Sequence, residues 1–146
     1  GWVKYFTATA FALVLTVLVM DPFTGIDEKI MNEVVMNHLK NMPSEIVTAD
    51  VGVAEKGLTK LDFSLISATS TKDMKLVGAR YCSILGQTAA QLSYRDFKGR
   101  RFTVYQVPLQ EEFKNEVGRL RASVVKGVNV ILYAEDGLLI AKAVSK

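Results

Sequence analysis

The sequence KLVGARYCSILGQTAAQLSYRDFKGRRFTVYQV, residues 75–107, contains the pattern that decides the fold. Two short breaks, at residues 85–87 and 96–99, separate segments rich in β-branched and aromatic residues, which predicts three consecutive antiparallel strands joined by tight turns. From residue 88 to residue 95 two sets of side chains alternate, which indicates a strand with one buried face. The first set is Thr88, Ala90, Leu92 and Tyr94, and the second is Ala89, Gln91, Ser93 and Arg95.

Length and composition indicate one folded domain. The chain has 146 residues, of which 49% are hydrophobic and 23% charged, and this is a globular composition. The net charge is +3, and most of the positive excess falls in residues 95–126. No basic helix face and no alternation of aromatic with basic residues accompanies that excess, so we predict a solvated surface and no nucleic-acid partner.

Residues 2–20, WVKYFTATAFALVLTVLVM, are strongly apolar, with no charged side chain in residues 5–20. A helix that crosses the hydrocarbon core of a bilayer needs about 20 residues, and Trp2 and Tyr5 are residue types that lie at the membrane interface. We therefore predict a single membrane helix at residues 2–20.

Flanking charges set the predicted orientation of this helix. Lys4 before the apolar run and Asp21 after it favour an N-terminus in the cytoplasm and a remaining chain outside. The core of a signal peptide and an apolar helix buried in an oligomer stay open as alternatives. Because the sequence begins at Gly1 rather than at methionine, we expect a cytoplasmic segment upstream.

An amphipathic helix is predicted for residues 27–41, because apolar residues recur there at helical spacing. The apolar stripe consists of Ile30, Met31, Val34, Val35 and Leu39. His38 lies off that stripe, so we expect it to be exposed or at the rim. We expect next a short edge strand at residues 45–48, a short helix at residues 50–60 and a strand at residues 61–67.

The C-terminal part is predicted to contain a charged helix or excursion at residues 109–122 and then a hairpin. The hairpin strands are residues 124–133 and 137–145, and Asp136-Gly137 between them is a pair that adopts positive φ. The predicted fold class is therefore α+β: an apolar N-terminal helix, an amphipathic helix and a mainly antiparallel sheet of about six strands. The predicted division is residues 1–23 for the membrane or apolar helix and residues 24–146 for the extracytoplasmic domain.

The chain offers few residues for catalysis or metal binding. Its one cysteine, Cys82, excludes an intramolecular disulfide, and its one histidine leaves no usual metal cluster. Strand alternation places Cys82 on a face with Leu76, Gly78 and Ile84, where a lone cysteine is typically a small core residue. Arg80 falls on the same face, where it must end at the strand edge or meet an acidic partner such as Asp62 or Asp50. We favour a structural ion pair for Arg80 over an anion-binding site. We predict no catalytic, cofactor-binding or metal-binding residues.

Several motifs resemble the extracytoplasmic part of transmembrane anti-sigma factors. The most telling is G-A-R-x-C-x-I-x-G-x-x-A-A-x-L-x-Y at residues 78–94. An E-I-x-T-x-D segment at residues 45–50, an L-D-F segment at residues 61–63 and a G-x-N-V hairpin at residues 127–141 fit as well. The resemblance covers roughly residues 34–145.

The resemblance implies a regulatory function carried out by binding. In such proteins a cytoplasmic zinc-binding domain sequesters a sigma factor, and one membrane helix links it to an outer sensor domain. The zinc ligands are not in this chain, so the sigma factor partner would bind an upstream segment. The expected location is the bacterial inner membrane, single-pass through residues 2–20, with residues 24–146 in the periplasm or outside the cell.

Two other functions stay open. A periplasmic module for a metal or small ligand would use Cys82 and His38 together with methionines, and an envelope enzyme would need a Cys82–His38 arrangement that the spacing does not support. The methionine candidates are Met31, Met36 and Met42. A homodimer also stays open, because two copies could pair their Cys82 or His38 side chains.

Overall fold

The computed structural model describes residues 25–111 and 120–146. Within these residues the chain has the predicted α+β fold, with two α-helices, α2 (Gly25–Lys40) and α3 (Val51–Gly57), and one six-stranded antiparallel sheet. The strand order is β1-β2-β3-β6-β5-β4. The strands are β1 (Lys75–Ile84), β2 (Gln87–Arg95), β3 (Arg101–Pro108), β4 (Arg121–Val125), β5 (Val128–Glu135) and β6 (Leu138–Ser145).

Tight turns with two positive-φ residues join three of the strand pairs. The pairs are Leu85-Gly86, Lys126-Gly127 and Asp136-Gly137, with φ near 50° at the first residue and 76° at the glycine. This conformation matches the right-handed twist of the flanking strands. The positive φ predicted for Asp136-Gly137 is therefore confirmed.

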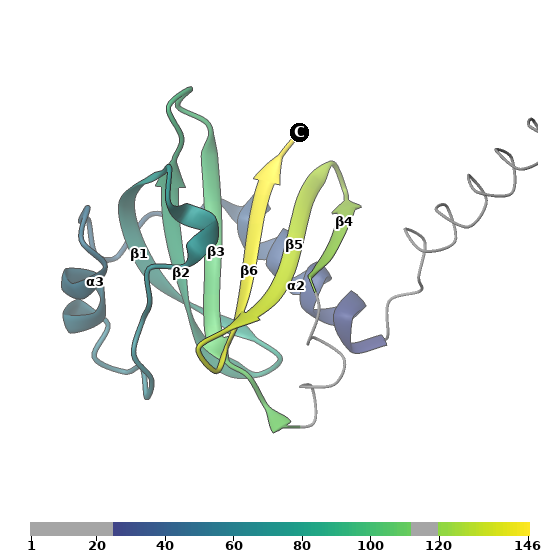
Figure 1. Ribbon diagram of the computed structural model, residues 1–146, viewed down its shortest axis with the longest axis horizontal. Coiled ribbons are helices and arrows are strands. Elements are labelled where there is room, and N and C mark those ends of the chain that lie inside the picture. The colour runs from purple at the N-terminus through teal and green to yellow at the C-terminus, as the bar shows by residue number, and fades with distance from the viewer. Residues whose placement is uncertain (1–24, 112–119) are drawn as a thin grey trace, which may run out of the picture.

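Different segments cover the two faces of the sheet (Figure 1). Helix α2 lies on one face and buries Ile30, Met31, Val34 and Val35. Helix α3 and residues 58–74, which include the short 3-10 helix η1 (Thr69–Thr71), lie on the other face. The sheet is thus the middle of three layers, and its central strands β2, β3 and β6 are buried on both faces.

This double burial corrects the prediction of a half-buried strand at residues 88–95. Ala90 and Leu92 face the layer of α3, as their alternation predicted, but Ala89 and Gln91 on the opposite face are buried too. Ala89 of this second face packs in the apolar cluster that α2 forms with the sheet.

Two predicted strands are wrong or reduced. Residues 61–67 form no strand; they cross the sheet as an irregular segment whose Phe63 and Leu65 pack into the core. Residues 45–48 contribute only one isolated bridge, from Ile46 to Ala79. The alternating apolar residues of 61–67 reflect packing onto a sheet, not hydrogen bonding within it.

The predicted strand at residues 124–133 is two strands. The turn at Lys126-Gly127 ends β4 and starts β5, so the chain reverses where the alternation appeared continuous. Strand β4 also begins earlier, at Arg121, within the stretch predicted as a charged helix. Most of that helix, residues 112–119, and the predicted apolar helix of residues 1–23 lie outside the described residues. None of the helices that the structure does describe is long and apolar enough to cross a membrane.

Gly78 is required by the close approach of the segment that follows α2. A Cβ atom at Gly78 would overlap the Ser44 side chain and lie 3.0 Å from the Ile46 carbonyl oxygen. We predict that Gly78→Ala lowers the free energy of unfolding by about 1–3 kcal/mol, because the backbone must move to relieve the overlap. Urea denaturation measures the change.

The matched control is Gly25→Ala, since a Cβ there has no neighbour within 4 Å in the part of the chain that the structure describes. Equal unfolding midpoints for Gly78→Ala and the control would show that residues 44–46 are not held against β1.

Candidate binding site

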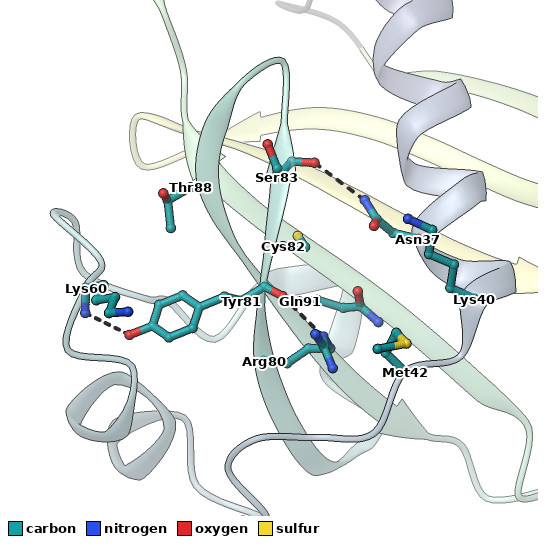
Figure 2. Close-up of a pocket in the computed structure, with 10 residues that line it drawn as sticks. All are labelled: Asn37, Lys40, Met42, Lys60, Arg80, Tyr81, Cys82, Ser83, Thr88 and Gln91. Atoms are coloured by element: carbon teal, nitrogen blue, oxygen red, sulfur yellow. Dashed lines mark hydrogen bonds between the residues drawn. The ribbon is translucent and has the colours of Figure 1, made fainter.

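A pocket of about 770 Å³ lies where the C-terminal end of α2 meets the edge strand β1 (Figure 2). Asn37 and Lys40 of α2 and Met42 of the following loop form one side. The floor comes from β1 and β2, and Lys60 lies at the far end. This volume is typical of sites for small organic ligands.

Side chains cap the outer edge of β1. Glu45 Oε1 accepts the Tyr81 N–H at 3.0 Å, and Glu33 Oε2 accepts the Leu85 N–H at 2.7 Å. Asn37 Nδ2 lies 3.5 Å from the Ser83 carbonyl oxygen. Because these groups occupy the positions of a neighbouring strand, the edge is protected against pairing with another chain.

Arg80 lies in the pocket, but its partners are not the predicted ones. It donates to the Pro43 carbonyl at 2.6 Å and to the Tyr81 carbonyl at 3.2 Å. Its acidic contact among the described residues is Glu45, whose Oε1 lies 3.9 Å from Arg80 Nη2. The expected pairing with Asp62 or Asp50 is therefore wrong, because the chain after α2 passes beside β1 and brings Glu45 there instead.

The environment of Cys82 is partly as predicted. A bulge between Leu76 and Gly78 reverses the alternation, so Leu76 faces the layer of α3 while Cys82 and Ile84 face that of α2. Cys82 is half-buried and lines the pocket. Burial raises the pKa of its thiol to about 12, and Arg80 opposes this only in part. At neutral pH the group is a protonated thiol and a weak nucleophile.

Gln91 is the site residue that the sequence did not reveal. It lies directly opposite Arg80 in the β1–β2 pairing, is 2% exposed and lines the pocket. Its Nε2 atom is buried, and it has no hydrogen-bond partner within residues 25–111 and 120–146. The absence of an acceptor for a buried N–H donor is unusual in folded proteins.

His38 is buried, contrary to the prediction that it is exposed or at the rim. Its Nδ1 lies 2.7 Å from Thr103 Oγ1 of β3, and its Nε2 lies 3.0 Å from Ser145 Oγ of β6. Its carbonyl accepts from Arg101 Nη1 at 3.0 Å. These bonds fix the last turn of α2 to the sheet, and Leu39, predicted to face the core, is 50% exposed instead.

The residues proposed as metal ligands do not come together. Cys82 and Met42 line the pocket, but His38 and Met31 point into the packed layer between α2 and the sheet, and Met36 is exposed. Among the described residues no group of three or more histidine, cysteine or acidic side chains is placed to hold a metal ion.

Comparison with known proteins found no matching family model, curated protein or solved structure.

His38 makes stability depend on pH. Burial, and then the positive charge of Arg101, lower its pKa from 6.5 to about 4. The unfolded chain therefore binds a proton before the folded one as the pH falls from 6.5 to 4, and stability decreases over that window. We predict a loss of up to about 3 kcal/mol in the free energy of unfolding that His38→Gln lacks.

The measurement is urea denaturation of the wild type and His38→Gln at several pH values between 7 and 4. The two proteins have the same carboxylates, so the difference between their stabilities isolates the contribution of His38. Parallel decreases for the two proteins would show that His38 is not held in the neutral form.

Proposed function

We propose that residues 24–146 are the extracytoplasmic sensory part of a membrane-anchored anti-sigma factor and act by binding rather than by catalysis. The protein would lie in the bacterial inner membrane, with residues 2–20 as its single span and a sigma factor bound by an upstream cytoplasmic segment. The motifs at residues 78–94 and 127–141 support the family. The geometry of α2 supports the mechanism.

The observation that carries this proposal is the double role of α2. The helix follows the apolar run of residues 5–20 closely in the sequence, and its last turn supplies Asn37 and Lys40 to the pocket. At 1.5 Å per residue, its 16 residues extend over roughly 24 Å. One rigid element therefore joins the pocket to the segment that leads toward the membrane.

Contacts at both ends hold α2 on the sheet. Asp27 in its first turn lies 3.8 Å from Arg121 of β4, and His38 in its last turn bonds to Thr103 and Ser145. A ligand that displaces the pocket end of α2 must lengthen or break the hydrogen bonds of His38 and strain the contact between Asp27 and Arg121. The proposed signal is thus a shift of α2 against the sheet, which biases the chain upstream of it.

A small-ligand module without a sigma factor is the second candidate, and the pocket itself favours it. The two functions differ in what precedes the chain. The anti-sigma proposal requires a histidine and paired cysteines encoded upstream of Gly1, and sequencing that region of the gene separates the two.

A reporter assay tests regulation directly. In a bacterium carrying a promoter that the partner sigma factor drives, the full-length protein should repress transcription and release it on envelope stress. We predict that His38→Ala changes basal repression at least about threefold, because it frees the pocket end of α2. Phe97→Ser is the matched control, since Phe97 is 87% exposed at the β2–β3 turn, remote in sequence from α2.

Replacing residues 24–146 by an unrelated folded domain should abolish the response. An unchanged response to every stress after that replacement would refute the sensory role, even if repression itself persisted.

A further inference from the structure

The buried amide of Gln91 is a donor without an acceptor inside the pocket. Its Nε2 has no partner in the described part of the chain, although the side chain is only 2% exposed. An unsatisfied buried donor costs free energy, and a ligand oxygen would remove that cost on binding. The position of the unpaired group therefore indicates where a polar atom of a ligand belongs.

Arg80 provides further donors beside that amide. Residues 80 and 91 are opposite each other on adjacent antiparallel strands, so their side chains project from the same face. Figure 2 shows the Arg80 guanidinium, the Gln91 amide and Met42 directed into the same part of the pocket. Hydrogen bonds to Tyr81 and Pro43 use two of the five N–H groups of Arg80.

The charges around the pocket favour an anion. Three cationic side chains line it, Lys40, Lys60 and Arg80, and no aspartate or glutamate of residues 25–111 and 120–146 does. Glu45 lies 3.9 Å from Arg80 and offsets part of its charge. A single negative charge fits this balance better than the dianion of a phosphate, which needs more donors around it.

The remaining walls accept an organic body. Met42, which lines the pocket with Gln91, is 49% exposed and unbranched, so its side chain can move to admit a ligand. Cys82 lines the same pocket and packs on the α2 side of the sheet. An apolar group attached to the anion would lie against these atoms.

We infer that the pocket binds a small organic monocarboxylate, whose oxygens accept hydrogen bonds from Gln91 Nε2 and the Arg80 guanidinium while its apolar body packs on Met42 and Cys82. The regulatory meaning of this ligand rests on the proposed sensory function. Binding itself does not, because it depends only on the groups in the pocket.

The test is a titration of the full chain, purified in neutral detergent at constant ionic strength, with sodium benzoate as the probe. We expect saturable one-to-one binding by calorimetry and a shift of the Gln91 side-chain amide signal in ¹⁵N NMR spectra. Benzyl alcohol, which has the same ring without the charge, should bind at least tenfold more weakly. Inorganic phosphate should also bind more weakly than benzoate.

Gln91→Met keeps the volume and removes the amide. This substitution should weaken benzoate binding at least tenfold. The thermal midpoint should stay equal to or above that of the wild type, because the Gln91 amide group of the wild type donates no hydrogen bond within the described residues that the substitution could remove. If Gln91 had a purely structural role, Gln91→Met would instead lower the thermal midpoint. Lys40→Gln, at an exposed position, should weaken benzoate about threefold, whereas Lys98→Gln, which removes an exposed charge outside the pocket lining, should leave the affinity within twofold.

Three results would overturn the inference: no saturable benzoate binding, equal benzoate affinity in Gln91→Met, or tighter binding of phosphate than of benzoate. If Gln91→Met does not fold, the wild-type amide shift and the Lys40→Gln affinity decide. If benzoate binds but the reporter does not respond to envelope stress, the sensory function is refuted and the carboxylate site still stands. If the reporter responds but benzoate does not bind, the carboxylate site is refuted and the sensory function still stands.

Discussion

Strand β3 is the part of the structure on which the other elements depend. Six of its eight residues are buried in succession, on both faces, which a strand can achieve only when a separate layer covers each side. Burial on this scale provides the main driving force for folding, and it requires α2 on one face and residues 58–74 on the other.

Two polar side chains of β3 fasten these two layers. Thr103 on the α2 side meets His38 Nδ1 at 2.7 Å. Gln106 on the opposite side bonds to both backbone groups of Ile66, accepting from its N–H at 3.0 Å and donating to its carbonyl at 2.8 Å. Each layer is therefore held by a hydrogen bond to a buried side chain of β3 as well as by apolar contact. Because such groups are costly to leave unpaired, they also define where each layer sits.

Local patterns in the sequence predicted the sheet and α2 but not the layer order. The turns at Gly86 and Gly137 and the spacing of Ile30, Val34 and Val35 identify strands and a helix because these signals involve near neighbours. Residues 61–67 alternate like a strand, yet alternation reports only which side chains face a sheet. The burial of His38 could have been predicted from the sequence. It is four residues after Val34 and seven after Met31, so helical geometry places it on the buried face of α2.

The candidate site depends on pairing between distant residues, which is why the sequence did not reveal it. Arg80 faces Gln91 only because the bulge after Leu76 and the turn at Leu85-Gly86 fix the β1–β2 register. Glu45 reaches Arg80 only because Gly78 lets residues 44–46 approach β1. None of these contacts between distant residues produces a periodic pattern in the sequence. The sequence predicted Cys82 to be a small core residue. Its position in a pocket wall depends on the β1–β2 register, which the sequence pattern does not specify.

The central claim is that occupancy of the pocket is coupled to α2. Backbone amide hydrogen exchange of α2, followed by mass spectrometry with and without saturating benzoate, tests this most directly. Coupling through Asn37, His38 and Lys40 predicts that exchange rates change at least about threefold along the whole of α2, including its first turns near Asp27, while α3 is unchanged. Changes confined to residues 37–42, or none at all, would contradict transmission by this helix.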